Sequence, residues 1–311
     1  MSTPSITVTT NSMKKVFVRF PHIKRLLERM DELYKHDCVD EEAENVLLLG
    51  ESGVGKSRLL QKFRNTYPPI IHEDFTEIPV LYLKVPSKGS INSLASAMLL
   101  EMRSVYWDRG TTIQLTKQLT KLLITCKVRI IILDEINHLV EKGGIKTHHG
   151  IADWLKILTD ETSIPFILAG IPRAERLLHA NDQLRSRFRE VITIQPFSVE
   201  NEKEKAVFRS VLKTFSQLIV DVPSVDLASP EMVDKMAFAT AGRLRDIRRL
   251  LVRAVEVGGK RSPPKISNEC LSDAFCQVIY PNAPDERNPF CTKFKKIPLT
   301  RANEPFAARE E

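Results

Sequence analysis

The eight residues 50–57, Gly-Glu-Ser-Gly-Val-Gly-Lys-Ser, restrict the fold of this chain more than any other segment. They match the pattern G-x-x-x-x-G-K-[ST], and the apolar run 46–49 comes directly before them. Glycines let a backbone wrap around an anion, and a helix starting at Lys56 would direct its N–H groups and its dipole at that anion. The segment therefore predicts a strand, a phosphate-binding loop and a helix.

The residue types in this loop indicate that ATP and Mg²⁺ bind there. Lys56 would neutralise the β- and γ-phosphates, and the Ser57 hydroxyl would be a magnesium ligand. A glycine-rich turn without a ligand is the alternative, but the expected strand and helix on either side favour nucleotide binding. The expected nucleotide-binding residues of the loop are Gly50, Glu51, Ser52, Gly53, Val54, Gly55, Lys56 and Ser57.

The segment 130–135, Ile-Ile-Ile-Leu-Asp-Glu, is expected to complete the same site. Four apolar residues are typical of a buried parallel strand, and ligands bind where such strands end. Asp134 suits the magnesium shell, and Glu135 suits a base that orients and deprotonates the attacking water. Two solvated acids at the start of a helix are the alternative, but the phosphate loop upstream favours the catalytic interpretation.

Apolar runs of strand length alternate with helical patterns as far as Pro196. The expected strands are 46–49, 80–83, 129–133, 165–169 and 191–194. This alternation predicts an α/β fold, with a parallel five-stranded sheet flanked by helices. Beyond Pro196 the strand pattern disappears, and helical patterns predict a small all-helical domain; they cover 200–218, 230–239, 243–257 and 267–279.

Four parts of the chain are therefore expected. They are a flexible N-terminal arm at 1–15, an ATPase core at 16–196, a helical lid domain at 197–280 and a C-terminal tail at 281–311. The arm is predicted because its start is rich in Ser and Thr and shows no apolar period. The tail is predicted to be mostly extended because prolines interrupt every possible helix.

Composition excludes several other classes of protein. With 42% hydrophobic and 27% charged residues the chain is typical of a globular protein, and its net charge of +7 permits contact with nucleic acid. The five cysteines contain no C-x-x-C pair, which argues against a disulfide framework or a zinc knuckle. No apolar run is long enough to cross a membrane and no signal peptide is recognisable, so we expect a cytoplasmic protein.

Two arginine-rich segments have positions that suit nucleotide sensing. The segment 183–189, Gln-Leu-Arg-Ser-Arg-Phe-Arg, precedes the last expected strand at the edge of the core, where a side chain can reach a neighbouring subunit. The segment 242–246, Gly-Arg-Leu-Arg-Asp, opens a helix of the second domain, where a cation can reach the γ-phosphate. Solvated basic surfaces are the alternative for both segments.

With these motifs in this order, the chain resembles AAA+ ATPases. More narrowly, it resembles the TniB/TnsC family of transposition regulators, which includes the TnsC proteins of CRISPR-associated transposons. The resemblance covers roughly residues 14–280, and four segments carry it: V-L-L-L-G-E-S-G-V-G-K-S, I-I-I-L-D-E-I-N-H-L, F-I-L-A-G-I-P-R and Q-L-R-S-R-F. The first two are common among P-loop ATPases, whereas the last two favour this family.

The resemblance implies ATP-driven assembly into rings or helical filaments around duplex DNA, which recruit or activate a transposase and contact a targeting protein or a CRISPR effector complex. It implies that Arg187, or else Arg185, acts on a neighbouring subunit, and that Arg245 senses the nucleotide from the lid. It also implies DNA-backbone contacts after the second strand and in the turn between the next two helices, with an ordinary solvated loop as an equal alternative. These places hold Lys84, Lys88, Ser90, Arg109, Thr111 and Thr112.

One segment departs from the AAA+ pattern. The fourth strand usually ends on an Asn or Thr that positions the attacking water, whereas the segment 169–171, Ala-Gly-Ile, offers no polar side chain. Slow hydrolysis is therefore expected.

Two alternative functions stay open. A replication initiator or helicase loader shares the core, but its usual extra DNA-binding domain has no room in the irregular residues after Tyr280. A nucleotide-gated scaffold would not touch DNA, and it would show no salt-dependent DNA binding.

Overall fold

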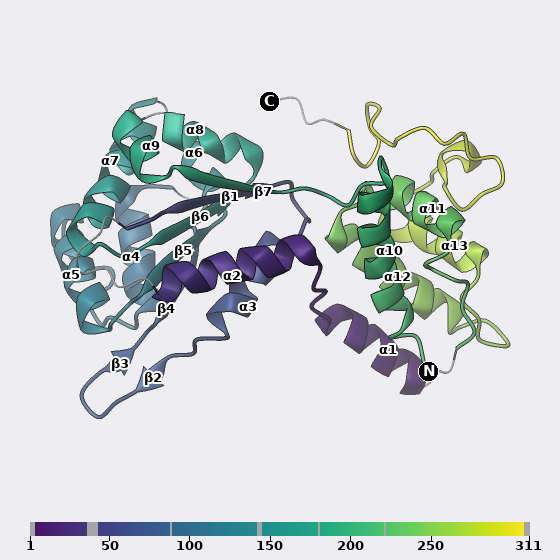
Figure 1. The fold of residues 1–311 in the computed structure, drawn as a ribbon, viewed down its shortest axis with the longest axis horizontal. Helices are drawn as coiled ribbons and strands as arrows, with labels where there is room; N and C mark the ends of the chain where they lie inside the picture. Colours follow the sequence, from purple (N-terminus) through teal and green to yellow (C-terminus); the bar gives the residue numbers. More distant parts are fainter. Residues whose placement is uncertain are drawn as a thin grey trace. The chain divides into compact units, whose positions relative to one another are not determined.

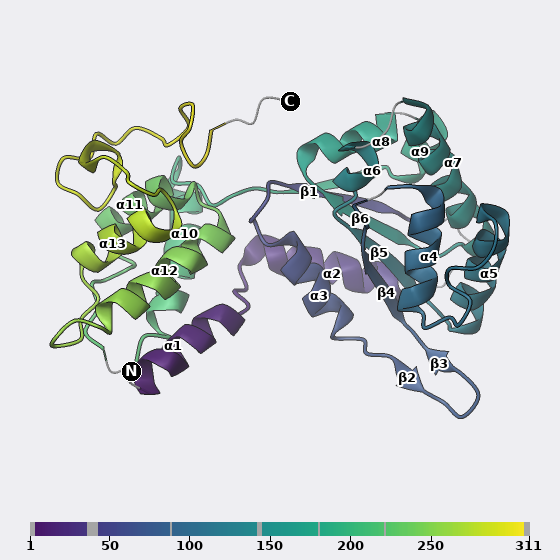
Figure 2. The same cartoon turned by 180° about the vertical axis from the view of Figure 1, so that it is seen from behind.

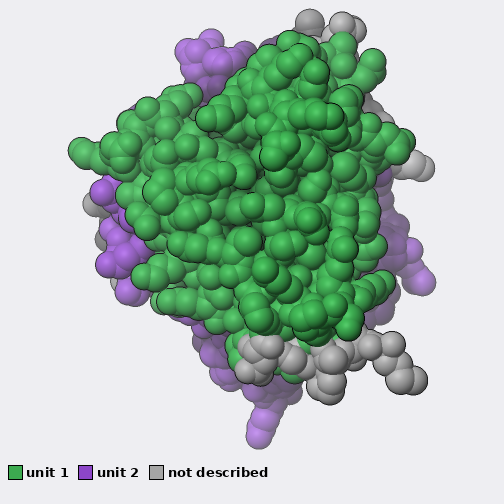
Figure 3. Space-filling model, turned by 90° about the vertical axis from the view of Figure 1, so that its right-hand side faces the viewer, with its two compact units in different colours: residues 1–20, 195–311 green, residues 21–194 purple. Residues whose placement is uncertain are grey.

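The computed structural model describes residues 4–35, 43–87, 89–141, 145–179, 181–220 and 222–307. The chain forms two compact units (Figures 1 and 3), of which one is Pro21–Ile194 and the other combines Met1–Phe20 with Gln195–Glu311. Within the described ranges, no helix has both the length and the apolar character that a membrane span requires.

The unit Pro21–Ile194 is built on a parallel five-stranded sheet with the order β4-β5-β6-β1-β7. Its strands are β1 (Val46–Gly50), β4 (Val80–Lys84), β5 (Ile130–Asp134), β6 (Phe166–Gly170) and β7 (Glu190–Ile194). Every residue of β1, β5 and β6 is buried, as expected for inner strands of a parallel sheet that is covered on both faces. The predicted fold class and all five predicted strands are confirmed.

Helices cover both faces of the sheet (Figures 1 and 2). On one face lie α2 (Pro21–Lys35) and α3 (Lys56–Arg64), and on the other lie α4 (Ile91–Glu101), α5 (Thr112–Thr125) and α7 (Ile145–Thr162). The remaining elements of this unit are the hairpin of β2 (Ile70–Ile71) and β3 (Thr76–Glu77), and the short helices α6 (Asn137–Glu141), η1 (Pro172–Glu175), α8 (Arg176–His179) and α9 (Asp182–Arg187).

The register of the strands brings their C-terminal ends to one edge of the sheet. Lys84 lies opposite Asp134, and Asp134 lies opposite Ala169. On the other side of β6, Leu49 lies opposite Gly170. The loops that follow these strands therefore meet at this edge, which is where parallel sheets bind ligands.

The second unit is helical. It contains α10 (Glu202–Ser216), α11 (Pro230–Thr240), α12 (Leu244–Gly258) and α13 (Asn268–Val278), at the four predicted positions. Amphipathic patterns with Ser or Asn caps explain this agreement, since Asn201, Ser229 and Ser267 each accept a hydrogen bond from a first-turn N–H group.

The expectation of a flexible arm at 1–15 is wrong for the described part of that segment. Residues Pro4–Lys15 form helix α1, whose Ile6 and Met13 are buried and which packs on α12. The approach is close, because a Cβ atom on Gly259 would lie 2.0 Å from Cδ1 of Ile6. The sequence does not reveal this buried stripe because its middle positions are threonines. The buried Thr10 hydroxyl donates a hydrogen bond to the carbonyl oxygen of Thr7 at 3.1 Å.

The C-terminal segment is irregular, as its prolines predict, but the expectation of a separate extended tail is wrong for residues 281–307. Apart from the turn η2 (Asp285–Arg287) it lacks regular structure, yet Phe290, Leu299 and Phe306 are buried. The Arg287 guanidinium forms two hydrogen bonds of 2.6 Å to the Glu304 carboxylate. The segment is therefore part of the helical unit.

Candidate active site

The loop between β1 and α3 has the geometry of a phosphate-binding loop. Gly53 and Gly55 have φ angles of 91° and 111°, which residues with a Cβ atom adopt only at a cost. A Cβ atom on Gly50 would lie 2.6 Å from the backbone oxygen of Ile194. Gly55 begins α3 without a side-chain cap, so phosphate oxygens fit as acceptors for the first N–H groups of the helix.

Lys56 folds back over this loop. Its ammonium donates hydrogen bonds to the carbonyl oxygens of Gly50 (2.6 Å) and Glu51 (3.1 Å), and the residue is 8% exposed. The contact between this ammonium and the phosphates stays a prediction.

Asp134 is held in place by hydrogen bonds to both of its carboxylate oxygens. It ends β5, is fully buried, and accepts bonds of 2.9 Å from the Tyr82 hydroxyl and from the N–H group of Glu135. Burial, reinforced by the charge of Asp134, raises the pKa of Tyr82 above its usual value, so the hydroxyl stays a donor. Sequence reasoning missed Tyr82, whose signal was a hydroxyl group in the middle of the apolar run 80–83.

Glu135 lies between two cationic or potentially cationic groups. Its carboxylate contacts the Lys84 ammonium at 3.0 Å and Nε2 of His138 at 3.0 Å. Burial favours the neutral acid, but the hydrogen bonds from Lys84 and His138 outweigh it and hold the pKa of Glu135 below its usual value. The φ angle of Glu135 is 59°, a left-handed conformation that strains a residue with a side chain and is common at functional sites.

The end of β6 explains why no polar side chain is found there. A Cβ atom on Gly170 would lie 2.7 Å from Cβ of Ala174 and 3.0 Å from Cγ1 of Ile136, so an Asn or Thr would not fit. The backbone nitrogen of Asn137 lies 3.6 Å from the same point, and Asn137 is largely buried. Sequence reasoning did not single out Asn137, although it is part of the segment that follows the D-E pair.

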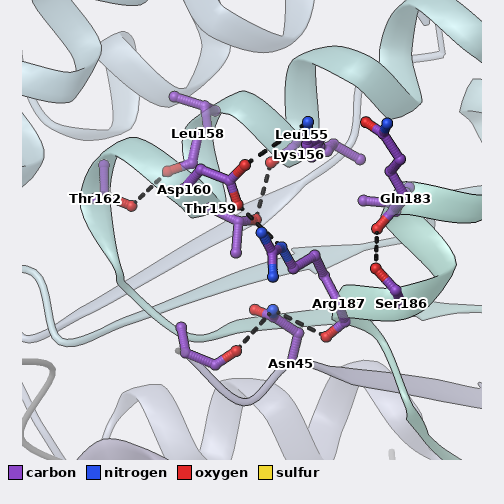
Figure 4. A network of polar contacts seen from close by, with 12 residues as sticks. Asn45, Leu155, Lys156, Leu158, Thr159, Asp160, Thr162, Gln183, Ser186 and Arg187 are labelled. Atoms are coloured by element: carbon purple, nitrogen blue, oxygen red, sulfur yellow. Dashed lines mark hydrogen bonds and ion pairs between the residues drawn. The ribbon is translucent and has the colours of Figure 1, made fainter. Parts of the chain in front are cut away.

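Arg187 does not project outward as its sequence suggests, because its side chain turns back onto its own chain (Figure 4). Nε donates to the Asp160 carboxylate on α7 at 3.0 Å, and Asn45 donates to the Arg187 carbonyl at 3.1 Å. The flanking Leu184 and Phe188 are buried and anchor the segment. The correction concerns the guanidinium, whose partner Asp160 lies far away in the sequence.

The other candidate arginines have different surroundings. The Arg185 side chain is 58% exposed and pairs with Asp182 at 3.2 Å, whereas the Arg187 side chain is 26% exposed. Arg245 lies in the first turn of α12, in the helical unit, and its Nε lies 3.8 Å from Asp246. Its role as a nucleotide sensor stays a prediction.

Two of the predicted DNA-binding segments are adjacent in the structure. Ser90 and Thr111 cap α4 and α5, and each accepts a hydrogen bond from a first-turn N–H group. The Thr112 hydroxyl donates to Oδ1 of Asn92 at 3.2 Å, so the two helices begin side by side. Paired helix N-termini with hydroxyl groups are suited to phosphate oxygens.

The basic residues predicted to bind DNA lie in different surroundings. Lys84 is the last residue of β4, and it forms an ion pair with Glu135, the candidate catalytic base. Arg109 is exposed, and its guanidinium lies 5.7 Å from the ring centroid of Tyr106. Lys88 lies outside the described residues.

A family model described as "Bacterial TniB protein" matches residues 10–198. The chain belongs to the TniB family. It is accordingly a P-loop ATPase with an AAA+ fold, which confirms the resemblance to the TniB/TnsC family and the predicted enzyme class. No curated protein sequence matches the chain.

Solved structures share the fold of this TniB protein at low sequence identity. Cdc6p from Pyrobaculum aerophilum has a TM-score of 0.62 at 14% identity, with 89% of this chain and 72% of that chain covered. ORC1 of Aeropyrum pernix in complex with DNA has a TM-score of 0.58 at 18% identity, with 84% and 66% covered. ORC2 of the same organism, in ADPNP–ADP complexes, has a TM-score of 0.63 at 12% identity, with 86% and 71% covered.

Proposed function

We propose that this TniB protein is an ATP-dependent DNA-binding regulator of transposition, which oligomerises on duplex target DNA and recruits or activates a transposase. The match of the TniB family model over residues 10–198 carries this proposal, because that range includes the phosphate loop, the D-E pair and both candidate DNA segments. A ring or helical filament, a targeting protein or CRISPR effector complex as partner, and a cytoplasmic location belong to the same proposal.

The nucleotide site supports the ATPase part of the cycle. Loop 50–57 would bind the phosphates through its N–H groups and Lys56, and Ser57 with Asp134 would hold Mg²⁺. When bound, Mg²⁺ would neutralise charge on the triphosphate. Glu135 would orient the attacking water and accept its proton. The absence of a polar side chain at Gly170 supports slow ATP hydrolysis. Slow hydrolysis suits a protein whose ATP-bound state matters more than its rate of hydrolysis.

Lys84 supports a link between DNA binding and hydrolysis. Its ammonium neutralises Glu135 at 3.0 Å in this conformation, and it is also a candidate contact for a DNA phosphate. A phosphate that draws Lys84 away would let the pKa of Glu135 rise and would free its carboxylate for the water. ATP hydrolysis would in this way respond to the DNA around which the protein assembles.

Arg187 supports the assembly part of the proposal. The Arg187 backbone is held by the hydrogen bond from Asn45 and by the buried neighbours Leu184 and Phe188. A catalytic arginine needs such a rigid backbone. Its ion pair with Asp160 is partly exposed, and such pairs contribute only about 0–1 kcal/mol. A γ-phosphate of a neighbouring subunit could therefore displace Asp160, with Arg185 as the second candidate for this role.

DNA binding tests the proposal directly. The purified protein is titrated onto labelled duplex DNA at several salt concentrations, with a slowly hydrolysed ATP analogue, with ADP and without nucleotide. We expect binding with the ATP analogue that weakens steeply with salt, because phosphate contacts release counterions. Electron microscopy of the same samples should show rings or filaments around DNA. Absence of nucleotide-dependent DNA binding would favour a scaffold that does not touch DNA.

A replication-initiator or helicase-loader role is the second candidate. The fold shared with Cdc6p and ORC1, the latter solved with DNA, favours it. The two functions differ in the partner: a regulator of transposition stimulates DNA insertion by its transposase, whereas a loader stimulates unwinding by a replicative helicase. Assays with both partners would separate the two functions.

A further inference from the structure

The turn between α4 and α5 exposes apolar side chains in an unusual concentration. Val105, Tyr106 and Trp107 follow one another and are 81%, 58% and 36% exposed, and Ile113 in the first turn of α5 is 70% exposed. Single exposed apolar residues are common on proteins, but a contiguous group indicates a contact surface. We define residues 105–109 as the aromatic turn.

The aromatic turn is anchored at both ends. Before it, Arg103 lies just after the end of α4 and has a left-handed φ of 57°, and the Ser104 hydroxyl accepts a 2.7 Å hydrogen bond from the Gln118 side chain. After it, Gly110 has a φ of 121° and Thr111 caps α5. The exposed rings therefore lie on a short turn whose two ends are held in place.

The chemistry next to the rings favours nucleic acid over protein as the partner. The Arg109 guanidinium lies 5.7 Å from the centroid of the Tyr106 ring, so a cation accompanies the exposed apolar surface. The turn leads directly into Thr111 and Thr112, at the paired N-termini of α4 and α5 where phosphates are expected to bind. Two adjacent rings, Tyr106 and Trp107, are followed by Asp108, the Arg109 cation and two threonine hydroxyls. Rings close to cations and hydroxyls are typical of surfaces that stack on bases and bind the adjoining backbone.

We propose that Tyr106 and Trp107 stack on bases of target DNA that are unpaired or unstacked, while Arg109 and the start of α5 bind the flanking phosphates. In an intact duplex the faces of the bases are covered by their neighbours, and exposing them costs a few kcal/mol per step. A distorted duplex has already lost that stacking, so the protein would prefer distorted sites. This inference rests on the proposed DNA-binding function and specifies the kind of DNA.

Comparison of two DNA molecules tests the inference. Affinities are measured for a fully paired duplex and for the same duplex with a short central mismatch bubble, both with a slowly hydrolysed ATP analogue. We expect the wild-type protein to prefer the bubble. Trp107→Ala should weaken bubble binding by roughly 5- to 150-fold, the range for loss of stacking on one base, and leave binding to the paired duplex nearly unchanged. The control Ile124→Ala removes an apolar residue of α5 that is 61% exposed, and it should change neither affinity.

Tryptophan fluorescence supplies a second readout. The chain has two tryptophans, and Trp154 is buried with its N–H bonded to Thr116 at 2.9 Å, so Trp107 is the one that DNA can reach. Bubble DNA should quench the emission of the wild-type protein. Trp107→Phe should retain bubble affinity, because phenylalanine also stacks, and should lose the quenching.

Different failures have different meanings. Equal affinity of the wild-type protein for both DNA molecules would overturn the inference and leave the proposed function intact. The same holds if Trp107→Ala binds both like the wild type, in which case the aromatic turn would be a protein contact. Failure of the wild-type protein to bind either DNA would overturn the proposed function and the inference together.

Discussion

At the residue scale, the Lys56 ammonium lies where the phosphates are expected, bonded to the carbonyl oxygens of Gly50 and Glu51. Lys56→Ala removes this charge and should abolish ATP binding, because the triphosphate loses its main side-chain counter-cation. Isothermal calorimetry measures the loss. Lys62→Ala, on an exposed position of the same helix, is the matched control and should bind ATP normally. Normal affinity of the Lys56 variant would refute the site.

Glu135 illustrates how a catalytic role can be separated from binding. Glu135→Gln keeps the shape of the side chain but cannot accept a proton from water, so ATP should stay bound and unhydrolysed. Phosphate release should fall by at least about a hundredfold, since general base catalysis contributes roughly 10²–10⁴-fold. DNA-bound assemblies should last longer than those of the wild type.

The control for that experiment is Glu200→Gln, which changes an exposed carboxylate in the helical unit. It should hydrolyse ATP at the wild-type rate. If Glu135→Gln does so as well, Glu135 is not the base.

At the element scale, the segment 281–307 depends on one buried ion pair. The side chains of Arg287 and Glu304 are 9% and 6% exposed, and Arg287 also donates to the carbonyl oxygens of Ile297 and Pro298 at 3.2 and 2.8 Å. Glu304→Gln would leave a buried guanidinium without its counter-charge and should lower the free energy of unfolding by about 2–4 kcal/mol. Urea denaturation measures this change.

The same pair predicts a dependence on acid. The hydrogen bond from Arg287 lowers the pKa of Glu304, so its stabilising contribution is complete above the ordinary value of 4.5 and is lost as the pH falls through the lower folded-state value. Glu304→Gln should remove this part of the acid sensitivity. The control Glu286→Gln breaks the exposed pair with Lys295 and should cost less than about 1 kcal/mol. Equal effects of the two variants would contradict the assigned role of Glu304.

At the scale of the whole molecule, the proposed active site is shared between subunits. Arg187→Ala should leave ATP binding to the monomer nearly intact but reduce hydrolysis and ATP-driven assembly together, since both need the contact with the γ-phosphate. Lys56→Ala subunits still offer Arg187, and Arg187→Ala subunits still offer a nucleotide site. A mixture of the two inactive variants should therefore recover part of the ATPase activity.

A check of co-assembly makes the mixing experiment decisive. Co-assembly of the variants is confirmed by pull-down with two different tags. If they co-assemble without recovering activity, Arg187 does not act on a neighbouring subunit, and Arg185, whose side chain is 58% exposed, is tested in the same way.

The sequence by itself determined the fold class and predicted the residues of the candidate nucleotide site. The glycine loop, Lys56, Ser57 and the D-E pair lie on continuous segments, and the alternation of buried strands with amphipathic helices is a local pattern that can be read without partners. The strand positions and the four helices of the second unit were predicted for the same reason.

Only the tertiary structure decided which distant residues meet. Three contacts join separate elements, and no spacing in the sequence encodes them: Glu135 with Lys84, Asp134 with Tyr82, and Arg187 with Asp160. The packing of 4–15 on α12 was hidden because threonines fill part of its buried stripe. The sequence predicts an extended tail for the irregular segment 281–307 because its buried phenylalanines and its ion pair follow no helical or strand period. Local periodicity therefore determines the elements, whereas the choice of partners depends on side-chain contacts that exist only after the chain has folded.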